Sequence, residues 1–95
     1  MKTDHRTCIV TGSASGIGAA TVMELASHGY HTFGLDLNAD GAQRVALQAG
    51  LEHPGTRHDG VLCDVADEAQ VIAAFRQAHE FLGSLDALVT SAGVV

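Results

Sequence analysis

Thr11-Gly12-Ser13-Ala14-Ser15-Gly16-Ile17-Gly18 is the stretch of this 95-residue chain that decides its fold. It lies between a short β-branched run, Thr7–Thr11, and a segment whose apolar residues recur at helical spacing. The spacing G-x-x-x-G-x-G predicts a strand that turns tightly at Gly12 and enters a helix near Gly16. In such a loop Gly16 allows the backbone to approach a pyrophosphate, and Gly18 allows the helix to pack close to the sheet. The free N–H groups and the dipole at the helix N-terminus favour such an anion.

Strands and helices are expected to alternate outward from this loop. Four apolar runs are predicted strands: Thr7–Thr11, His31–Asp36, Gly60–Cys63 (starting one or two residues earlier) and Asp86–Ser91. Three segments with one apolar face are predicted helices: Gly16–His28, Ala39–Ala49 and Asp67–Leu82. Each helix is followed by a glycine that suits its C-terminal end: Gly29, Gly50 and Gly83. Asp67 is expected to cap the third helix, with Gln70 as its capping-box partner.

The order of these elements predicts an α/β fold. Strands that are apolar on both faces and alternate with helices are typical of a parallel sheet flanked by helices. Right-handed crossovers give the strand order 3-2-1-4 of a Rossmann-type sheet, with the third helix on the opposite face from the first two. We therefore expect residues 1–95 to form a nucleotide-binding half-domain, the N-terminal part of a longer fold. The fourth strand is then an exposed apolar edge, Ala87–Val89, which favours self-association of the isolated chain.

Composition excludes several function classes. The net charge of −6 and the pI near 5.3 argue against nucleic acid or an anionic membrane as the main partner. The sequence has neither a run of about 20 apolar residues nor a secretory pattern at its start, so a cytoplasmic location is expected. Cys8 and Cys63 are expected to be separate buried thiols. The six histidines have no metal-ligand spacing, so surface or loop positions and no metal site are expected: His5, His28, His31, His53, His58 and His79.

Acidic residues follow two of the predicted strands. Asp36 lies 18 residues beyond Gly18, close to the spacing of an acid that binds the adenosine ribose. It could equally be a strand-end aspartate that starts the turn Leu37–Gly41. Asp64 could accept a hydrogen bond from an adenine amino group, or be a loop residue before the third helix. Asp86 is expected to be a solvated turn residue.

Four motifs in order resemble the short-chain dehydrogenase/reductase family. The loop matches that family's Thr-Gly-x-x-x-Gly-Ile-Gly, Asp36 matches its acidic strand end, and Asp64-Val65 matches its adenine-flanking pair. Thr90-Ser91-Ala92-Gly93 stands where the family has Asn-Asn-Ala-Gly, so both asparagines are replaced. The resemblance implies NAD as the cofactor. It implies a cofactor site made of Gly12, Ser15, Gly16, Ile17, Gly18, Asp36, Leu37, Asp64, Val65, Ser91, Ala92 and Gly93.

The resemblance also implies hydride transfer between a nicotinamide and an alcohol or carbonyl substrate, in a complete protein that forms a homo-oligomer. The family's catalytic serine and Tyr-x-x-x-Lys pair follow the fourth strand. The chain's one tyrosine, Tyr30, is followed four residues later by Gly34, and its one lysine is Lys2, so no catalytic residue is predicted here. Two alternatives stay open: a stand-alone nucleotide-binding module without catalysis, and a methyltransferase-like enzyme that binds an adenosyl cofactor. The loop lacks the lysine of a nucleoside-triphosphatase loop, which excludes that class.

Overall fold

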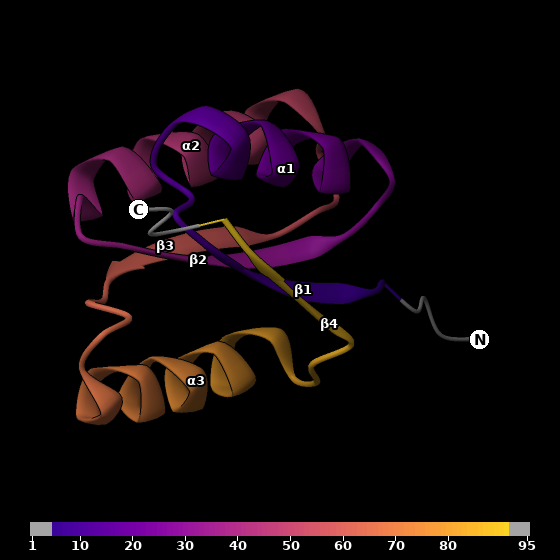
Figure 1. The fold of residues 1–95 in the computed structure, drawn as a ribbon. Helices are drawn as coiled ribbons and strands as arrows, with labels where there is room; N and C mark the ends of the chain where they lie inside the picture. The colour runs from indigo at the N-terminus through magenta and orange to yellow at the C-terminus, as the bar shows by residue number, and fades with distance from the viewer. Residues whose placement is uncertain (1–4, 92–95) are drawn as a thin grey trace.

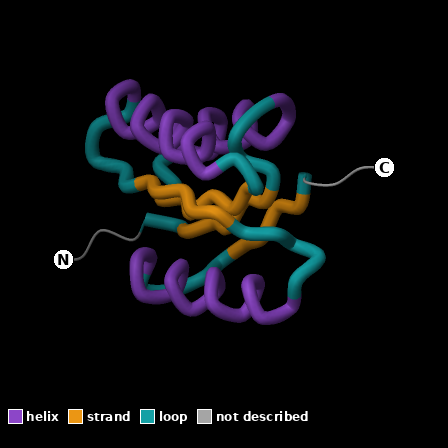
Figure 2. The backbone as a smooth tube through the Cα atoms, turned by 90° about the vertical axis from the view of Figure 1, so that its left-hand side faces the viewer, coloured by secondary structure: helices purple, strands orange, loops and turns teal. Residues whose placement is uncertain are grey.

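The computed structural model of the chain describes residues 5–91 and has three layers. A four-stranded parallel sheet has the order β3-β2-β1-β4, as predicted, and is made of β1 (Thr7–Thr11), β2 (His31–Asp36), β3 (His58–Leu62) and β4 (Ala87–Thr90). Helices α1 (Gly16–Ser27) and α2 (Ala39–Glu52) cover one face, and α3 (Glu68–Leu82) covers the other (Figure 1). Figure 2 shows the sheet between the two helical layers.

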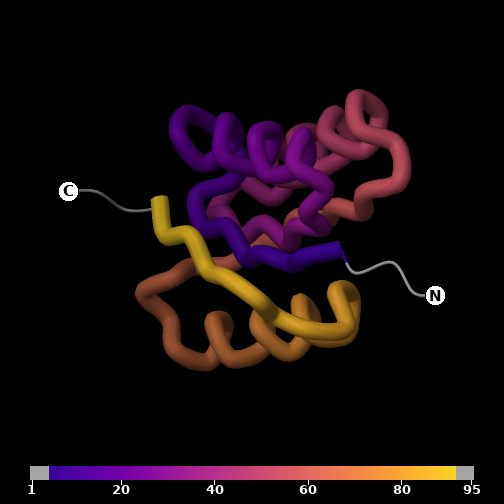
Figure 3. Tube along the Cα trace, turned by 90° about the vertical axis from the view of Figure 1, so that its right-hand side faces the viewer, coloured from indigo at the N-terminus to yellow at the C-terminus, as the bar shows by residue number. Residues whose placement is uncertain are grey.

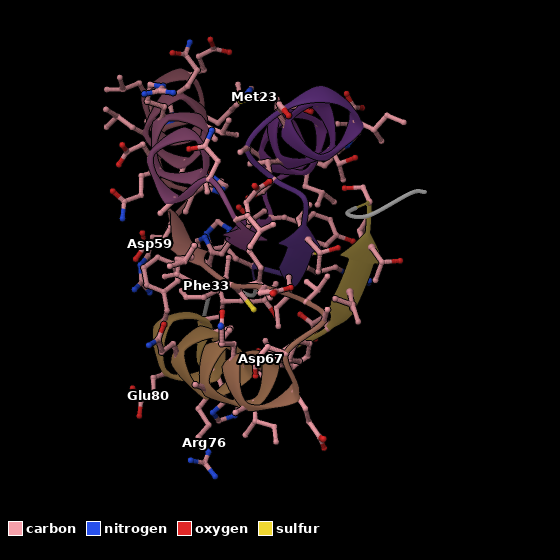
Figure 4. All side chains as sticks on the ribbon, turned by 60° about the vertical axis from the view of Figure 1, so that its left-hand side comes forward. Met23, Phe33, Asp59, Asp67, Arg76 and Glu80 are labelled. Atoms are coloured by element: carbon pink, nitrogen blue, oxygen red, sulfur yellow. The ribbon has the colours of Figure 1, made fainter. Side chains whose placement is uncertain are left out.

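Two apolar clusters hold these layers together, because alternate residues of β1 point to opposite faces. Cys8 and Val10 pack under α1 and α2, together with Val22, Ala26 and Ala49. Ile9 packs on the other face with residues of the sheet and of α3: Phe33, Leu35, Cys63, Ala74, Ala78 and Leu82. Phe33 lies between the sheet and α3 (Figure 4). The two cysteines are buried free thiols on opposite faces of the sheet, and burial raises the pKa of both.

The second helix ends later than predicted. It continues through Gly50 to Glu52, and the backbone N–H of His53 donates to Ala49 at 2.9 Å. A glycine ends a helix when it takes a positive φ, which Gly29 (φ 86°) and Gly83 (φ 85°) do. Gly50 stays helical, because the chain turns instead at Pro54 and Gly55, whose φ is 97°.

The ends of the third and fourth strands also differ from prediction. Strand β3 spans His58–Leu62, so it starts two residues before Gly60, as expected, but ends one residue before Cys63. Strand β4 is one residue shorter at each end than Asp86–Ser91. Asp86 is exposed but is not a free turn residue. Its carboxylate accepts from the backbone N–H of Thr7 at 2.9 Å and from the Thr7 hydroxyl at 3.2 Å, which fixes the start of β4 against β1.

The cap of α3 is partly as predicted. The Asp67 carboxylate accepts from the backbone N–H groups of Ala69 and Gln70, so Asp67 is the N-cap. Gln70 does not complete a capping box, because its side-chain oxygen accepts from the N–H of Asp64 at 2.8 Å rather than from that of Asp67. Gln70 therefore fixes the chain just after β3.

The fourth strand lies at one edge of the sheet, and among the described strands it pairs with β1 alone (Figure 3). Leu88 in this strand is 51% exposed. Within residues 5–91, no helix has the length and apolar character needed to cross a membrane.

Candidate functional site

The site lies where the carboxyl ends of the parallel strands meet the glycine loop. A cavity of about 530 Å³ opens there, which is within the usual size range of small-molecule sites. Seven of the predicted site residues line it: Gly12, Ser15, Asp36, Leu37, Asp64, Val65 and Ser91. Elements that are far apart in the sequence thus converge on one hollow.

The glycines of the loop meet different physical requirements. Gly12 has a φ of 70°, and its N–H donates to the carbonyl of Leu35 in the neighbouring strand at 2.7 Å. A Cβ at Gly18 would lie 1.8 Å from the carbonyl oxygen of Gly12, so only glycine lets α1 start this close to the turn. Gly16 has a φ of 59°, and apart from its chain neighbours and its own helix backbone no atom lies within 4 Å of the position its Cβ would take, which leaves open space at the helix start.

The N-terminus of α1 offers hydrogen-bond donors to this space. Ser15 is the N-cap residue, but its side chain makes no capping hydrogen bond. The first N–H groups of a helix have no partner within the helix, and they carry the positive end of its dipole. The open space at Gly16 and these donors suit the pyrophosphate of a dinucleotide. Ile17 is 77% exposed beside the loop but does not line the cavity.

Asp36 joins the end of β2 to the glycine loop. One carboxylate oxygen accepts from the N–H of Ala14 at 3.0 Å, and the other accepts from the N–H of Asn38 at 2.8 Å. The second bond is the one expected of a strand-end aspartate that starts a turn. Because a carboxylate has about four acceptor positions, both oxygens can still accept from a ligand hydroxyl.

Asp64 and two exposed apolar side chains form the adjoining wall. The Asp64 side chain accepts from the N–H of Ala66 at 2.9 Å, which shapes the loop after β3. Leu37 is 69% exposed and Val65 is 45% exposed, and both line the cavity. Exposed apolar side chains on a cavity wall suit the flat face of an aromatic base such as adenine.

Ser91 lies at the end of β4, where the family pattern has an asparagine. Its N–H lies 3.1 Å from the hydroxyl oxygen of Thr11, and its own hydroxyl donates to the Thr11 carbonyl. Ser91 thus braces the ends of β1 and β4 at the rim of the cavity. Ala92 and Gly93 lie outside the described residues.

Sequence reasoning missed three lining residues: Leu35, Cys63 and Ala66. Each is a chain neighbour of a predicted site residue, so adjacency was the signal that could have found them. The pKa of the Cys63 thiol is raised mainly by burial, and further by the carboxylates of Asp64 and Asp67. The thiol therefore stays neutral near pH 7.

A second hollow of about 570 Å³ lies against the outer side of α3. All of its lining residues belong to that one helix: Val71, Ile72, Phe75, Arg76, His79 and Glu80. In Figure 4 Arg76 and Glu80 point away from the sheet. No strand end or helix N-terminus contributes to it, so the cavity at the glycine loop is the better candidate site.

Comparison with known proteins identifies the family. The family model described as short chain dehydrogenase matches residues 6–95. The chain belongs to the short-chain dehydrogenase family. A curated member, D-threitol dehydrogenase from Mycolicibacterium smegmatis, is 44% identical over 94 residues, which cover 99% of this chain and 35% of that protein. Cis-4-hydroxycyclohexanecarboxylate dehydrogenase from Sinomonas cyclohexanicum is 45% identical over 90 residues, 95% of this chain and 35% of that protein.

Solved short-chain dehydrogenase structures have the same fold. Hydroxysteroid dehydrogenase from Escherichia coli superposes with a TM-score of 0.88 at 31% identity, covering 96% of this chain and 38% of that chain. The 3-ketoacyl-(acyl-carrier-protein) reductase from Brucella melitensis, complexed with NADH, superposes with a TM-score of 0.79 at 30% identity. The match covers 87% of this chain and 32% of that chain. The chain thus spans about one third of the length of these relatives.

Proposed function

We propose that residues 1–95 are the NAD-binding half-domain of an oxidoreductase that transfers hydride between a nicotinamide cofactor and an alcohol or carbonyl substrate. The observation that carries this proposal is the convergence of the glycine loop, Asp36 and Asp64-Val65 on one cavity at the N-terminus of α1. The family membership and the solved relative complexed with NADH support a nicotinamide cofactor. The cofactor supplies the hydride-transfer chemistry when it is bound.

The residues of this chain would bind and orient the cofactor. The backbone at Ser15, Gly16, Ile17 and Gly18, with the turn at Gly12, would hold the pyrophosphate. Asp36 would accept from the ribose hydroxyls. Leu37, Asp64 and Val65 would contact the adenine. Ser91, Ala92 and Gly93 would contact the nicotinamide ribose.

Asp36 is also our reason to propose NAD rather than NADP. Two like unit charges about 4 Å apart repel by roughly 4 kcal/mol at an effective dielectric constant of about 20. The 2′-phosphate of NADP would meet this repulsion at Asp36 unless a cation were close by. The neighbouring cavity residues Ser15 and Leu37 carry no charge. Arg44 lines a different groove, between α1 and α2.

We propose that residues outside this chain complete the enzyme. The family's serine and Tyr-x-x-x-Lys have no counterpart in residues 1–95. The two relatives named as dehydrogenases of a polyol and of a hydroxy acid support an alcohol as the substrate class. We further propose that the complete protein is a cytoplasmic homo-oligomer whose partners are NAD and a small substrate, and neither nucleic acid nor a membrane.

Calorimetric titration of the complete protein with NAD and with NADP tests the proposal, together with an alcohol-oxidation assay. Tight binding of NAD with measurable turnover supports it. Binding of NAD without turnover of any alcohol or carbonyl would instead support a stand-alone nucleotide-binding module. Binding of neither cofactor would overturn the assignment of the cavity.

A further inference from the structure

A cluster of histidines lies at the amino ends of β1, β2 and β3, whereas the candidate site lies at the carboxyl ends of the strands. His31 starts β2 and His58 starts β3, while His5 precedes β1 and His53 follows α2. The rings of His5 and His31 lie 4.3 Å apart with an angle of 36° between their planes. The sequence pattern predicts scattered surface or loop histidines. That expectation is wrong for His31 and His58, which are half-buried strand residues.

The hydrogen bonds around His58 fix where its proton lies. The hydroxyl of Thr56 donates its one proton to the carbonyl of His53 at 2.7 Å. The same hydroxyl oxygen lies 2.6 Å from His58 Nε2 and can only accept there, so Nε2 carries the proton. His58 Nδ1 must then accept from the hydroxyl of Thr32, which lies 2.7 Å away in β2. If the ring were protonated, Nδ1 would become a donor, and the Thr32 hydroxyl could then no longer donate to it.

His31 is held in the same neutral form. Its Nδ1 accepts from the backbone N–H of Arg57 at 2.8 Å. A protonated imidazole has no acceptor, so protonation would leave this N–H facing another donor. Protonation of His58 would likewise remove the acceptor of the Thr32 hydroxyl, whose residue is only 1% exposed. A buried hydroxyl or amide without a partner is costly.

The charged groups around these rings also oppose protonation. Burial is the main cause that lowers the pKa of His58 to about 4, and His31 and His53 lower it further. Burial, His5 and Arg57 lower the pKa of His31. The guanidinium of Arg57 lies 4.5 Å from the ring centroid of Phe81 in α3.

Among residues 5–91, none of the carboxylates forms an ion pair with these histidines or with Arg57. Asp59 and Glu80 line a separate hollow together with Val61 and Phe81, rather than the one that His58 lines. Glu52 accepts a hydrogen bond from Gln48 on the exposed side of α2. Within residues 5–91, the one ion pair found joins His28 to Glu24, on α1.

We propose that His31 and His58, with Thr32 and Thr56, form an acid-sensitive latch that holds residues 53–58 and the start of β3 against β2 while both rings are neutral. Protonation opens the latch and frees the amino end of the edge strand. This inference does not depend on the identity of the ligand at the opposite edge of the sheet.

The sign of the pH effect follows from linkage. A histidine in the unfolded chain has a pKa of about 6.5, so the unfolded state takes up the proton first as the pH falls. The stabilisation is complete above pH 6.5 and is lost between about 6.5 and 4. For His58 alone, the unfolding constant is expected to rise about tenfold between pH 7 and pH 5, after allowing for the solvent-facing part of the ring.

The test is an NMR titration of the histidine Cε1–H signals of the complete protein, combined with hydrogen exchange of residues 53–62 at pH 7 and pH 5. We expect His58 to titrate well below 6.5. After correction for the intrinsic rate, which itself falls with pH, we expect exchange in this segment to rise at pH 5. His58→Gln offers one donor and one acceptor without titrating, so it should reduce the pH-dependent rise to the part that His31 contributes. His79→Gln, at an exposed position on α3, is the matched control and should leave the rise unchanged.

Two results would overturn the latch. One is a His58 pKa at or above 6.5 in the wild-type protein. The other is exchange of residues 53–62 that is the same at both pH values after correction for intrinsic rates. Both are measured on the wild type, so the test stands even if a variant fails to fold.

Discussion

The carboxylate of Asp36 accepts a hydrogen bond of 3.0 Å from the backbone N–H of Ala14, and so fixes the glycine loop to the end of β2. Its second oxygen holds the N–H of Asn38 at 2.8 Å, just before α2. The same side chain lines the candidate site. Asp36 therefore has a structural role in shaping the loop, besides the ribose-binding role that we propose.

Replacement of Asp36 by alanine is expected to destabilise the complete protein even without cofactor. Two backbone N–H groups lose a charged acceptor, which typically costs about 1–3 kcal/mol. Urea unfolding of Asp36→Ala measures this loss, with Glu80→Ala on the exposed side of α3 as the control. Equal stability of the two variants would show that neither the Ala14 bond nor the Asn38 bond stabilises the fold.

Two glycine-to-alanine substitutions are expected to have opposite effects. Gly18→Ala would place a Cβ 1.8 Å from the carbonyl oxygen of Gly12, so we expect a loss of about 2 kcal/mol or more and weaker nucleotide binding. Gly50→Ala meets open space inside α2 and is expected to stabilise by about 0.5–1 kcal/mol. Thermal unfolding of both variants checks the pair, and a stable Gly18→Ala variant would contradict the close approach.

Ser13→Ala is expected to stabilise the protein. The Ser13 hydroxyl oxygen is buried and has no hydrogen-bond partner among residues 5–91, and a buried unpaired polar group costs about 1–3 kcal/mol. Removing it should therefore raise the free energy of unfolding by about 1 kcal/mol. The control is Ser27→Ala, at an exposed position whose hydroxyl donates to the Glu24 carbonyl. A loss of stability in Ser13→Ala would mean that the hydroxyl has a partner in solution.

The isolated chain of residues 1–95 is expected to self-associate and to oxidise no alcohol. The exposed edge of β4 can pair with another strand, and Leu88 adds apolar surface to it. Light scattering and a turnover assay on this chain check both parts. Leu88→Lys should reduce association. A monodisperse, cooperatively folding wild-type chain would contradict the first part, and any turnover would contradict the second.

The sequence predicted the strand order because periodicity and glycine positions are local signals. It did not predict where α2 ends, since Gly50 and Gly55 look alike in sequence and only the backbone distinguishes the helical glycine from the turning one. The cavity residues could be predicted because parallel strands bring their carboxyl ends to one edge.

The histidine cluster and the Asp86 contact could not be predicted in this way. His5, His31 and His58 are more than 25 residues apart in sequence, and only the strand register aligns them. The bond between Asp86 and Thr7 likewise spans almost the whole chain. Contacts of this kind depend on register, which a residue pattern alone leaves open.

The most direct test of the proposed function is kcat/KM of the complete protein with NAD and with NADP. It is measured for the wild type, for Asp36→Ala, and for Asp36→Ala combined with Leu37→Arg. The repulsion between Asp36 and the 2′-phosphate of NADP is roughly 4 kcal/mol, and even a third of it corresponds to about a tenfold difference in affinity. The wild type should therefore have a kcat/KM about tenfold or more higher with NAD than with NADP. The single variant controls for the lost Ala14 bond, and the double variant should shift the preference toward NADP. A wild type that uses both cofactors equally well would contradict the account, because Asp36 would then not face the ribose.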